Sequence, residues 1–108
     1  MTFTDDEIGA AIDYLRDSSG RAAEARAQVG YLEQWLRSLR ATLALRAVGS
    51  SMAEREAIAL SHPDYLAAID AYKVAVEADA KYRFLREAAK AKIEAWQTHS
   101  ANERATRI

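Results

Sequence analysis

One seven-residue repeat runs from Ile8 to Arg46 and constrains the fold more than any other feature of the chain. The first position of each repeat is apolar in every case: Ile8, Leu15, Ala22, Val29, Leu36 and Leu43. The position three residues later is occupied by Ala11, Ser18, Ala25, Leu32, Leu39 and Arg46. This is the a and d pattern of helices that pack along a narrow seam. A helix with one narrow apolar stripe needs a partner helix, from its own chain or from a second copy.

The composition favours an all-α chain of one domain. The 108 residues include only 4 Gly and 1 Pro, and Ala, Leu, Arg and Glu are abundant. We therefore expect an elongated helical hairpin, or coiled-coil-like bundle, with an N-terminal helical arm and a short connecting helix. A chain of this size is too small for a typical enzyme with a deep pocket.

Capping and breaking residues divide the repeat into two predicted helices. Thr4 is suited to be the N-cap of an arm helix over 5–17, because acidic residues then fill the first turn. The run Ser18-Ser19-Gly20 predicts a kink or a short break. A long helix over 20–48 follows, with Gly49 as its C-cap glycine.

Two more helices are predicted after residue 50. Ser51 and Glu54 have the spacing of a capping box, which predicts a short helix over 52–60. Pro63 suits the first position of a final helix over 64–97. Residues 98–108 read as a polar tail that frays.

The apolar face of the final helix is predicted to change sides near Asp79. At about 100° per residue, one group of apolar residues lies on one face and a second group on the opposite face. The first group is Tyr65, Ile69, Tyr72 and Val76, and the second is Tyr82, Leu85, Ala89, Ile93 and Trp96. Either a second subunit covers one face or the N-terminal helix folds back over it. We expect the protein to form a homodimer.

Charge and hydropathy point to a soluble protein of the cytoplasm. The chain has no cysteine for disulfides or thiolate metal sites, and no apolar run approaches the length of a membrane span. The N-terminus is acidic and has no apolar signal segment. The net charge is −1, so the overall charge does not indicate nucleic-acid binding. The charge is nevertheless arranged in blocks of −4 (1–17), +3 (20–48), −4 (49–79) and +4 (80–92).

No catalytic or metal-binding signature is present, so we predict a protein that is not an enzyme and that needs no cofactor or metal. The only histidines are His62, in a turn beside Pro63, and His99, four residues before Glu103. We expect His62 to cap the turn and His99 to be exposed.

Basic and aromatic residues define the candidate binding surface. The stretch 81–92 could follow a phosphate backbone while an aromatic ring stacks on a base, although its charges could equally form a solvated face. Trp35 lies beside Leu32 and Leu36, where it could either flank a dimer seam or anchor a partner. The candidate residues are Trp35, Arg37, Arg40, Lys81, Tyr82, Arg83, Arg86 and Lys90.

Four segments together resemble a family of small helical proteins of tailed bacteriophages and prophages. They are Tyr31–Ala41 (YLEQWLRSLRA), Ala53–Ala57 (AEREA), Ser61–Tyr65 (SHPDY) and Ala91–Thr98 (AKIEAWQT). Members of this family occur among recombination and replication genes. The resemblance implies a phage-encoded protein that acts in the host cell cytoplasm.

The main hypothesis is a non-enzymatic accessory protein that binds a protein of the recombination or replication machinery through a helix face, with weak single-stranded DNA contact. The alternative is an inhibitor of a host defence complex, such as an anti-CRISPR protein, that uses an acidic surface. That surface would consist of Asp64, Asp70, Glu77 and Asp79. A plain oligomerisation module is the third possibility, in which only the heptad matters.

Overall fold

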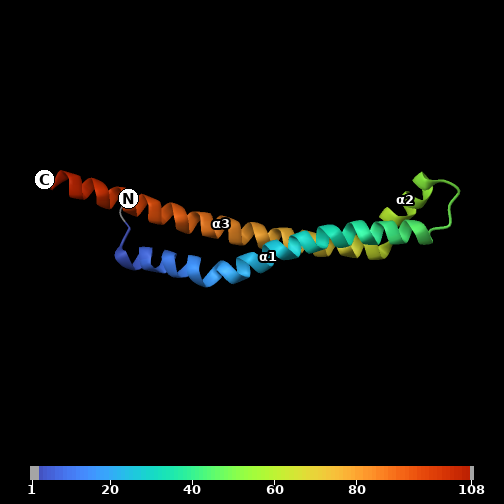
Figure 1. The fold of residues 1–108 in the computed structure, drawn as a ribbon, viewed down its shortest axis with the longest axis horizontal. Helices are drawn as coiled ribbons and strands as arrows, with labels where there is room; N and C mark the ends of the chain where they lie inside the picture. The colour runs from blue at the N-terminus through green and yellow to red at the C-terminus, as the bar shows by residue number, and fades with distance from the viewer. Residues whose placement is uncertain (1–2, 108) are drawn as a thin grey trace. The chain divides into compact units, whose positions relative to one another are not determined.

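A computed structural model describes residues 3–107, and all the regular structure in this range is helical. The elements are α1 (Asp5–Arg46), α2 (Met52–Ser61) and α3 (Pro63–Thr106), shown in Figure 1. The all-α prediction is confirmed. The contacts divide the chain into two compact units. Unit 1 combines the residues up to Ala23 with those from Ala80 onward, and unit 2 is Glu24–Asp79.

In each unit a segment of α1 packs against a segment of α3 that runs in the opposite direction (Figure 1). The heptad of α1 faces this partner. Its buried positions are Ile8, Ala11 and Ser18 in unit 1, and Val29, Leu32 and Leu43 in unit 2. The other a and d positions are half-buried, except for the exposed Arg46 at the end of the helix. The partner helix that the repeat requires is therefore supplied by the same chain.

Of the kink or short break predicted at residues 18–20, the break is wrong, because α1 is continuous from Asp5 to Arg46, while the kink stays a prediction. The Ser19 hydroxyl donates a hydrogen bond to the Arg16 carbonyl oxygen (3.0 Å) and does not stop the helix. Ser18 is buried in the seam. The separate helices predicted over 5–17 and 20–48 are thus one helix.

Capping residues set most of the helix ends. The Glu7 N–H donates to Thr4 Oγ1 (3.1 Å) and the Thr4 N–H to Glu7 Oε2 (3.3 Å), which makes the predicted N-cap a full capping box. The Ser51 cap is confirmed as well, since its hydroxyl accepts from the Glu54 N–H at 3.1 Å. Gly49 is not a left-handed C-cap: α1 ends at Arg46, and no glycine in residues 3–107 has a positive φ.

The final helix begins as predicted and ends later. Pro63 is the first residue of α3, where its missing N–H has no bond to lose. The helix continues to Thr106, so the predicted end at Gln97 and the predicted frayed tail over 98–108 are wrong. Ile108, the last residue of that tail, lies outside the described residues.

The predicted change of apolar face on α3 is also wrong. One alternating three-and-four spacing of buried or half-buried positions continues through both units: Tyr65, Ala68, Tyr72, Ala75 and Asp79 in unit 2, then Tyr82, Arg86, Ala89, Ile93, Trp96 and Ser100 in unit 1. Ile69, Val76 and Leu85, which were assigned to the two faces, are exposed. A seam between paired helices has a period of 3.5 residues, whereas a straight helix has 3.6 and drifts by about 20° per heptad. From Tyr65 to Tyr82 this drift amounts to only about 50°, so the false change of side came mainly from counting exposed apolar residues as part of the seam.

Candidate functional site

A groove in unit 2 lies between the end of α1 and α2. Its volume is about 490 Å³, and we call it the arginine groove. Its lining consists of four apolar and four charged residues: Ala41, Ala44, Leu45, Met52, Arg37, Arg40, Arg55 and Glu56. The groove contains two of the predicted binding residues, Arg37 and Arg40. The prediction did not include Leu45, Met52 or Arg55, because only the fold brings α2 beside α1.

The apolar side chains of the arginine groove are open to solvent. Leu45 is 83% exposed and Met52 is 67% exposed. Isolated exposed apolar residues are ordinary, but two that line the same groove mark a surface suited to a partner. Methionine also adapts its shape to different partners. Because the groove is shallow at these residues, it suits a segment of another protein better than a buried small molecule.

The charged rim of the groove is partly fixed by contacts within unit 2. Arg40 forms an ion pair with Glu56 across the groove (3.7 Å). The Arg55 Nε donates to the Gly49 carbonyl oxygen at 3.1 Å, which holds its side chain at the groove. Within residues 3–107, Arg37 takes part in no ion pair. The rim therefore has a net positive charge, with Arg37 able to receive an acidic group.

Two hydrogen-bonded groups of unit 2 have shifted pKa values. The N–H and the hydroxyl of Ser50 both donate to the Glu54 carboxylate and lower its pKa. The Tyr72 hydroxyl donates to Glu33 Oε1 (3.0 Å), and this bond raises the pKa of Tyr72. The first pair secures the start of α2 beside the groove, and the second joins α3 to α1.

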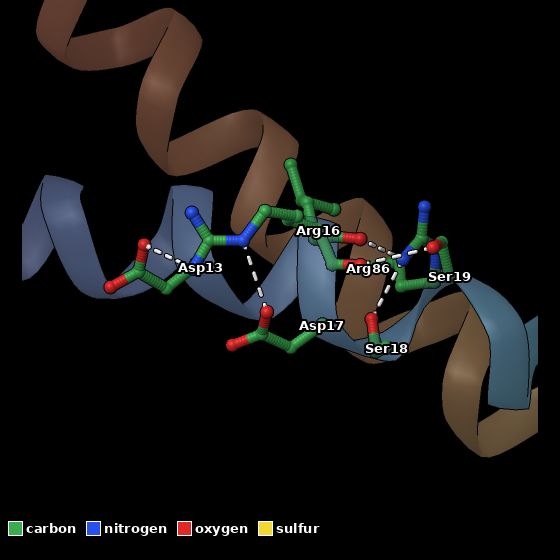
Figure 2. Close-up of polar contacts among 7 residues, drawn as sticks. Asp13, Arg16, Asp17, Ser18, Ser19 and Arg86 are labelled. Carbon is green, nitrogen blue, oxygen red and sulfur yellow. Dashed lines mark hydrogen bonds and ion pairs between the residues drawn. The ribbon is translucent and has the colours of Figure 1, made fainter.

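The predicted basic surface lies in unit 1, but its residues have different roles there. Lys81, Arg83 and Lys90 are exposed, whereas Tyr82 is half-buried on the seam. Arg86 points from α3 toward α1 in Figure 2, and its Nη1 donates to the Leu15 carbonyl oxygen and to Ser18 Oγ, both at 2.7 Å. Arg86 and Tyr82 are therefore engaged in helix pairing, and three basic side chains remain exposed to solvent.

Phe84 is an exposed aromatic residue of the predicted 81–92 stretch, although it is not among the eight candidate residues. The Arg83 guanidinium lies 5.2 Å from the centre of its ring. The spacing contained a signal for this: Phe84 lies outside the three-and-four positions that Tyr82 and Arg86 occupy. An aromatic ring stacking on a base would therefore come from Phe84.

The predicted acidic surface includes one residue that is already paired. Asp79 lies on the seam and forms an ion pair with Arg26 of α1 (3.4 Å). Asp64, Asp70 and Glu77 are exposed. Asp79 thus contributes to the pairing of α1 with α3, and the exposed acidic residues are the other three.

Both histidines contact residues that are close to them in the sequence. His62 Nδ1 accepts a hydrogen bond from the Asp64 N–H (3.0 Å), so His62 caps the turn as predicted. His99 Nε2 lies 3.2 Å from Glu103 Oε1 on the same exposed face of α3. Residues 3–107 contain no cluster of three or more His, Cys, Asp or Glu placed to hold a metal ion. In the same range, no helix combines the length and the apolar character needed to cross a membrane.

The fold of the described residues defines only a broad class of protein, an all-α chain in which antiparallel helix segments pair within each unit. Comparisons with protein-family models, curated proteins and solved structures give no match. The resemblance to phage proteins stays a prediction.

Proposed function

We propose that the protein is a non-enzymatic binding protein whose arginine groove receives an acidic amphipathic segment of a partner protein. The observation that supports this is the combination of two open apolar side chains, Leu45 and Met52, with a rim of three arginines and one glutamate. An amphipathic helix can place its apolar face in such a groove and its acidic residues against the rim. Arg37 is the arginine best placed to form an ion pair with an acidic residue of that helix.

The partner we propose is a protein of a phage recombination or replication machinery. This part rests on the resemblance of four segments to small phage proteins. The groove supports the chemical character of the docking segment, and the resemblance supports the class of the partner protein. An experiment can therefore contradict one of these two parts without contradicting the other.

Weak contact with single-stranded DNA is the second element of the proposal. Lys81, Arg83 and Lys90 are exposed and supply positive charge, and Phe84 supplies a ring for stacking. Because only three of the predicted basic side chains are exposed, the contact should be weak and should decrease with salt. Fluorescence anisotropy of a labelled oligothymidylate at low and moderate salt measures it. Loss of binding in a Phe84→Ala variant, but not in Tyr82→Phe, would support the assignment of the ring.

Site-specific photo-crosslinking tests the groove. A photoreactive amino acid at Leu45 or at Met52 is expected to capture the same protein in a cell that carries the phage genes. The same amino acid at Ala91, which is exposed in unit 1, is the control. The captured segment should be acidic and amphipathic, and the captured protein should act in recombination or replication.

Binding of a synthetic peptide with the captured sequence then tests the role of charge. Arg37→Glu should lower the affinity for the peptide at least about tenfold, because it reverses an interfacial charge. Arg21→Glu, an exposed arginine outside the groove, should leave the affinity unchanged. Equal losses in both variants would contradict the groove assignment. Capture of a host defence protein through Asp64, Asp70 and Glu77 would favour the inhibitor alternative instead.

A further inference from the structure

A second surface of unit 2 is apolar and uncharged. A groove of about 400 Å³ is lined there by Ala25, Gln28, Leu32, Ala71, Val74, Ala75 and Ala78. Tyr31 and Trp35 of α1 border it, since they follow Gln28 by three and seven residues and share its side of the helix. Tyr31 is 63% exposed and Val74 is 66% exposed. We call this groove with Tyr31 and Trp35 the neutral face.

The two edges of the seam in unit 2 are therefore different. On one edge α1 carries Arg26, Glu33 and Arg40 at intervals of seven residues, and each bonds to another helix of the unit. On the other edge α1 carries Gln28 and Trp35, and the groove between α1 and α3 has no ionisable lining residue. Polar contacts complete the first edge. The second edge remains an open apolar strip.

The surface area of the chain exceeds that of a compact monomer of the same mass. The chain exposes 7989 Å², whereas a folded monomer of its 12.0 kDa mass exposes about 6,000 Å². The surplus of about 2,000 Å² is what one subunit of a large obligate dimer can bury. No large side chain in residues 3–107 is fully buried. The helix pair thus has little core of its own and has surface in excess.

The chemistry of the neutral face suits a second copy of the same chain. A two-fold interface brings a patch against itself, so a charged patch would meet its own charge, while a neutral one does not. On α3 the small residues Ala67, Ala71, Val74 and Ala78 follow one another at intervals of four, three and four, a second heptad seam beside the one used within the chain. Small side chains allow two helices to approach closely. Aromatic residues such as Tyr31 and Trp35 are frequent anchors at such interfaces.

We propose that the neutral face is the interface of a homodimer, in which the α3 segments of two copies pack around a two-fold axis near Val74. Tyr31 and Trp35 cover the flanks of the contact. This interface is separate from the arginine groove, so the dimer would leave the groove available to a different protein.

The test uses two valines that lie two residues apart on α3. Val74 belongs to the neutral face, whereas Val76 lies on the polar edge, between Tyr72 and Asp79. Wild-type chain should sediment with twice the chain mass. Val74→Glu should raise the dimer dissociation constant about a hundredfold or more, because it buries an unpaired charge at the centre of the contact. Val76→Glu should leave the dimer unchanged, as should Leu45→Glu in the arginine groove.

Two outcomes would overturn the proposal. One is a wild-type chain that stays monomeric throughout the micromolar range. The other is a dimer that Val74→Glu and Val76→Glu weaken equally. Circular dichroism of each variant establishes that its helices are intact, as expected for valines that are exposed in the chain.

Single-cysteine variants provide an independent test, because the chain has no cysteine of its own. Under oxidation, cysteine at position 74 or at its neighbours on the face, 71 and 78, should link two copies, since a disulfide forms only where Cα atoms approach within about 7 Å. Val76→Cys is the matched control. If none of the three links faster than the control, the two-fold axis does not lie at this face and the proposal fails.

Discussion

The two units use the same heptad repeat but fill their seams with different chemistry. In unit 2, Val29 and Leu32 of α1 form a buried cluster with Ala75 and Tyr72 of α3. In unit 1, the corresponding layer is polar, with the buried Ser18 bonded to the half-buried Arg86 (Figure 2). The period of a repeat decides which sides of two helices meet. The side chains at the seam decide how strongly the helices are held and in which register.

Unit 1 contains a further buried polar group. The Tyr14 hydroxyl is buried and has no hydrogen-bond partner among the described residues. Buried polar groups weaken a seam relative to apolar ones of the same shape, but they can specify one register over others. We therefore expect unit 2 to supply most of the stability and unit 1 to supply selectivity in pairing.

The largest expected effect comes from truncating the apolar seam. Leu32→Ala should lower the free energy of unfolding by about 2–4 kcal/mol, because it leaves a cavity beside Val29 and Ala75. Leu15→Ala, at a half-buried seam position in unit 1, should cost about 1 kcal/mol. Urea unfolding followed by circular dichroism measures both. Equal losses would show that the two seams contribute alike.

The second effect concerns the polar layer. Arg86→Met should cost about 1–2 kcal/mol, because it leaves Ser18 buried without its partner. Adding Ser18→Ala should recover much of that loss, since an apolar pair of similar shape replaces a charged one. Unfolding of both single variants and the double variant gives the coupling energy. A double variant whose loss equals the sum of the single losses would mean that the two residues are not coupled.

The sequence predicts the seam of α1 well and the seam of α3 poorly, for a physical reason. On α1 the repeat is apolar at almost every seam position from Ile8 to Leu43, so its period can be recognised from the sequence alone. On α3 the seam passes through Asp79, which is ion-paired with Arg26 of α1, and through Arg86, which donates hydrogen bonds to neutral groups of α1. A prediction of the α3 seam from apolar residues alone therefore includes exposed side chains such as Ile69 and omits the charged seam residues.

The helix limits and the grooves show where local sequence signals were sufficient. The cap at Ser51 was found, because a capping box is formed by neighbouring residues. The break at Ser18-Ser19-Gly20 was not real, since packing in the seam outweighed weak helix propensity. The arginine groove could not be predicted, because Met52 lines it beside Leu45 only after the chain turns.

The third expected effect compares the two capping boxes. Ser51→Ala should destabilise α2 by about 1 kcal/mol, because the Glu54 N–H loses its acceptor. Thr4→Ala removes the equivalent bond at the start of α1, where fraying of one turn leaves the seam beyond it intact. Hydrogen exchange should therefore increase across α2 in the first variant and only in the first turn of α1 in the second. Exchange that increases throughout α1 in Thr4→Ala would contradict this difference.

The smallest effect appears only at alkaline pH and should be confined to unit 2. The Tyr72 hydroxyl donates to Glu33, and its pKa is raised because ionisation would break this bond and place two negative charges together. The folded-state pKa then exceeds the unfolded value of about 10. The bond contributes its full stability below that value and loses it as the pH rises through the folded-state pKa.

Tyr72→Phe tests this relation, because phenylalanine has no proton to lose. Wild-type unfolding midpoints should fall toward those of Tyr72→Phe as the pH rises from about 8 to about 11. Glu33→Gln should shift the ionisation of Tyr72 to lower pH, measured by the absorbance of the phenolate, because the amide accepts the hydrogen bond without the negative charge. Hydrogen exchange in unit 1 should be the same in wild type and Tyr72→Phe at each pH. A difference there would mean that the Tyr72–Glu33 bond supports both helix pairs and that the two seams are not independent.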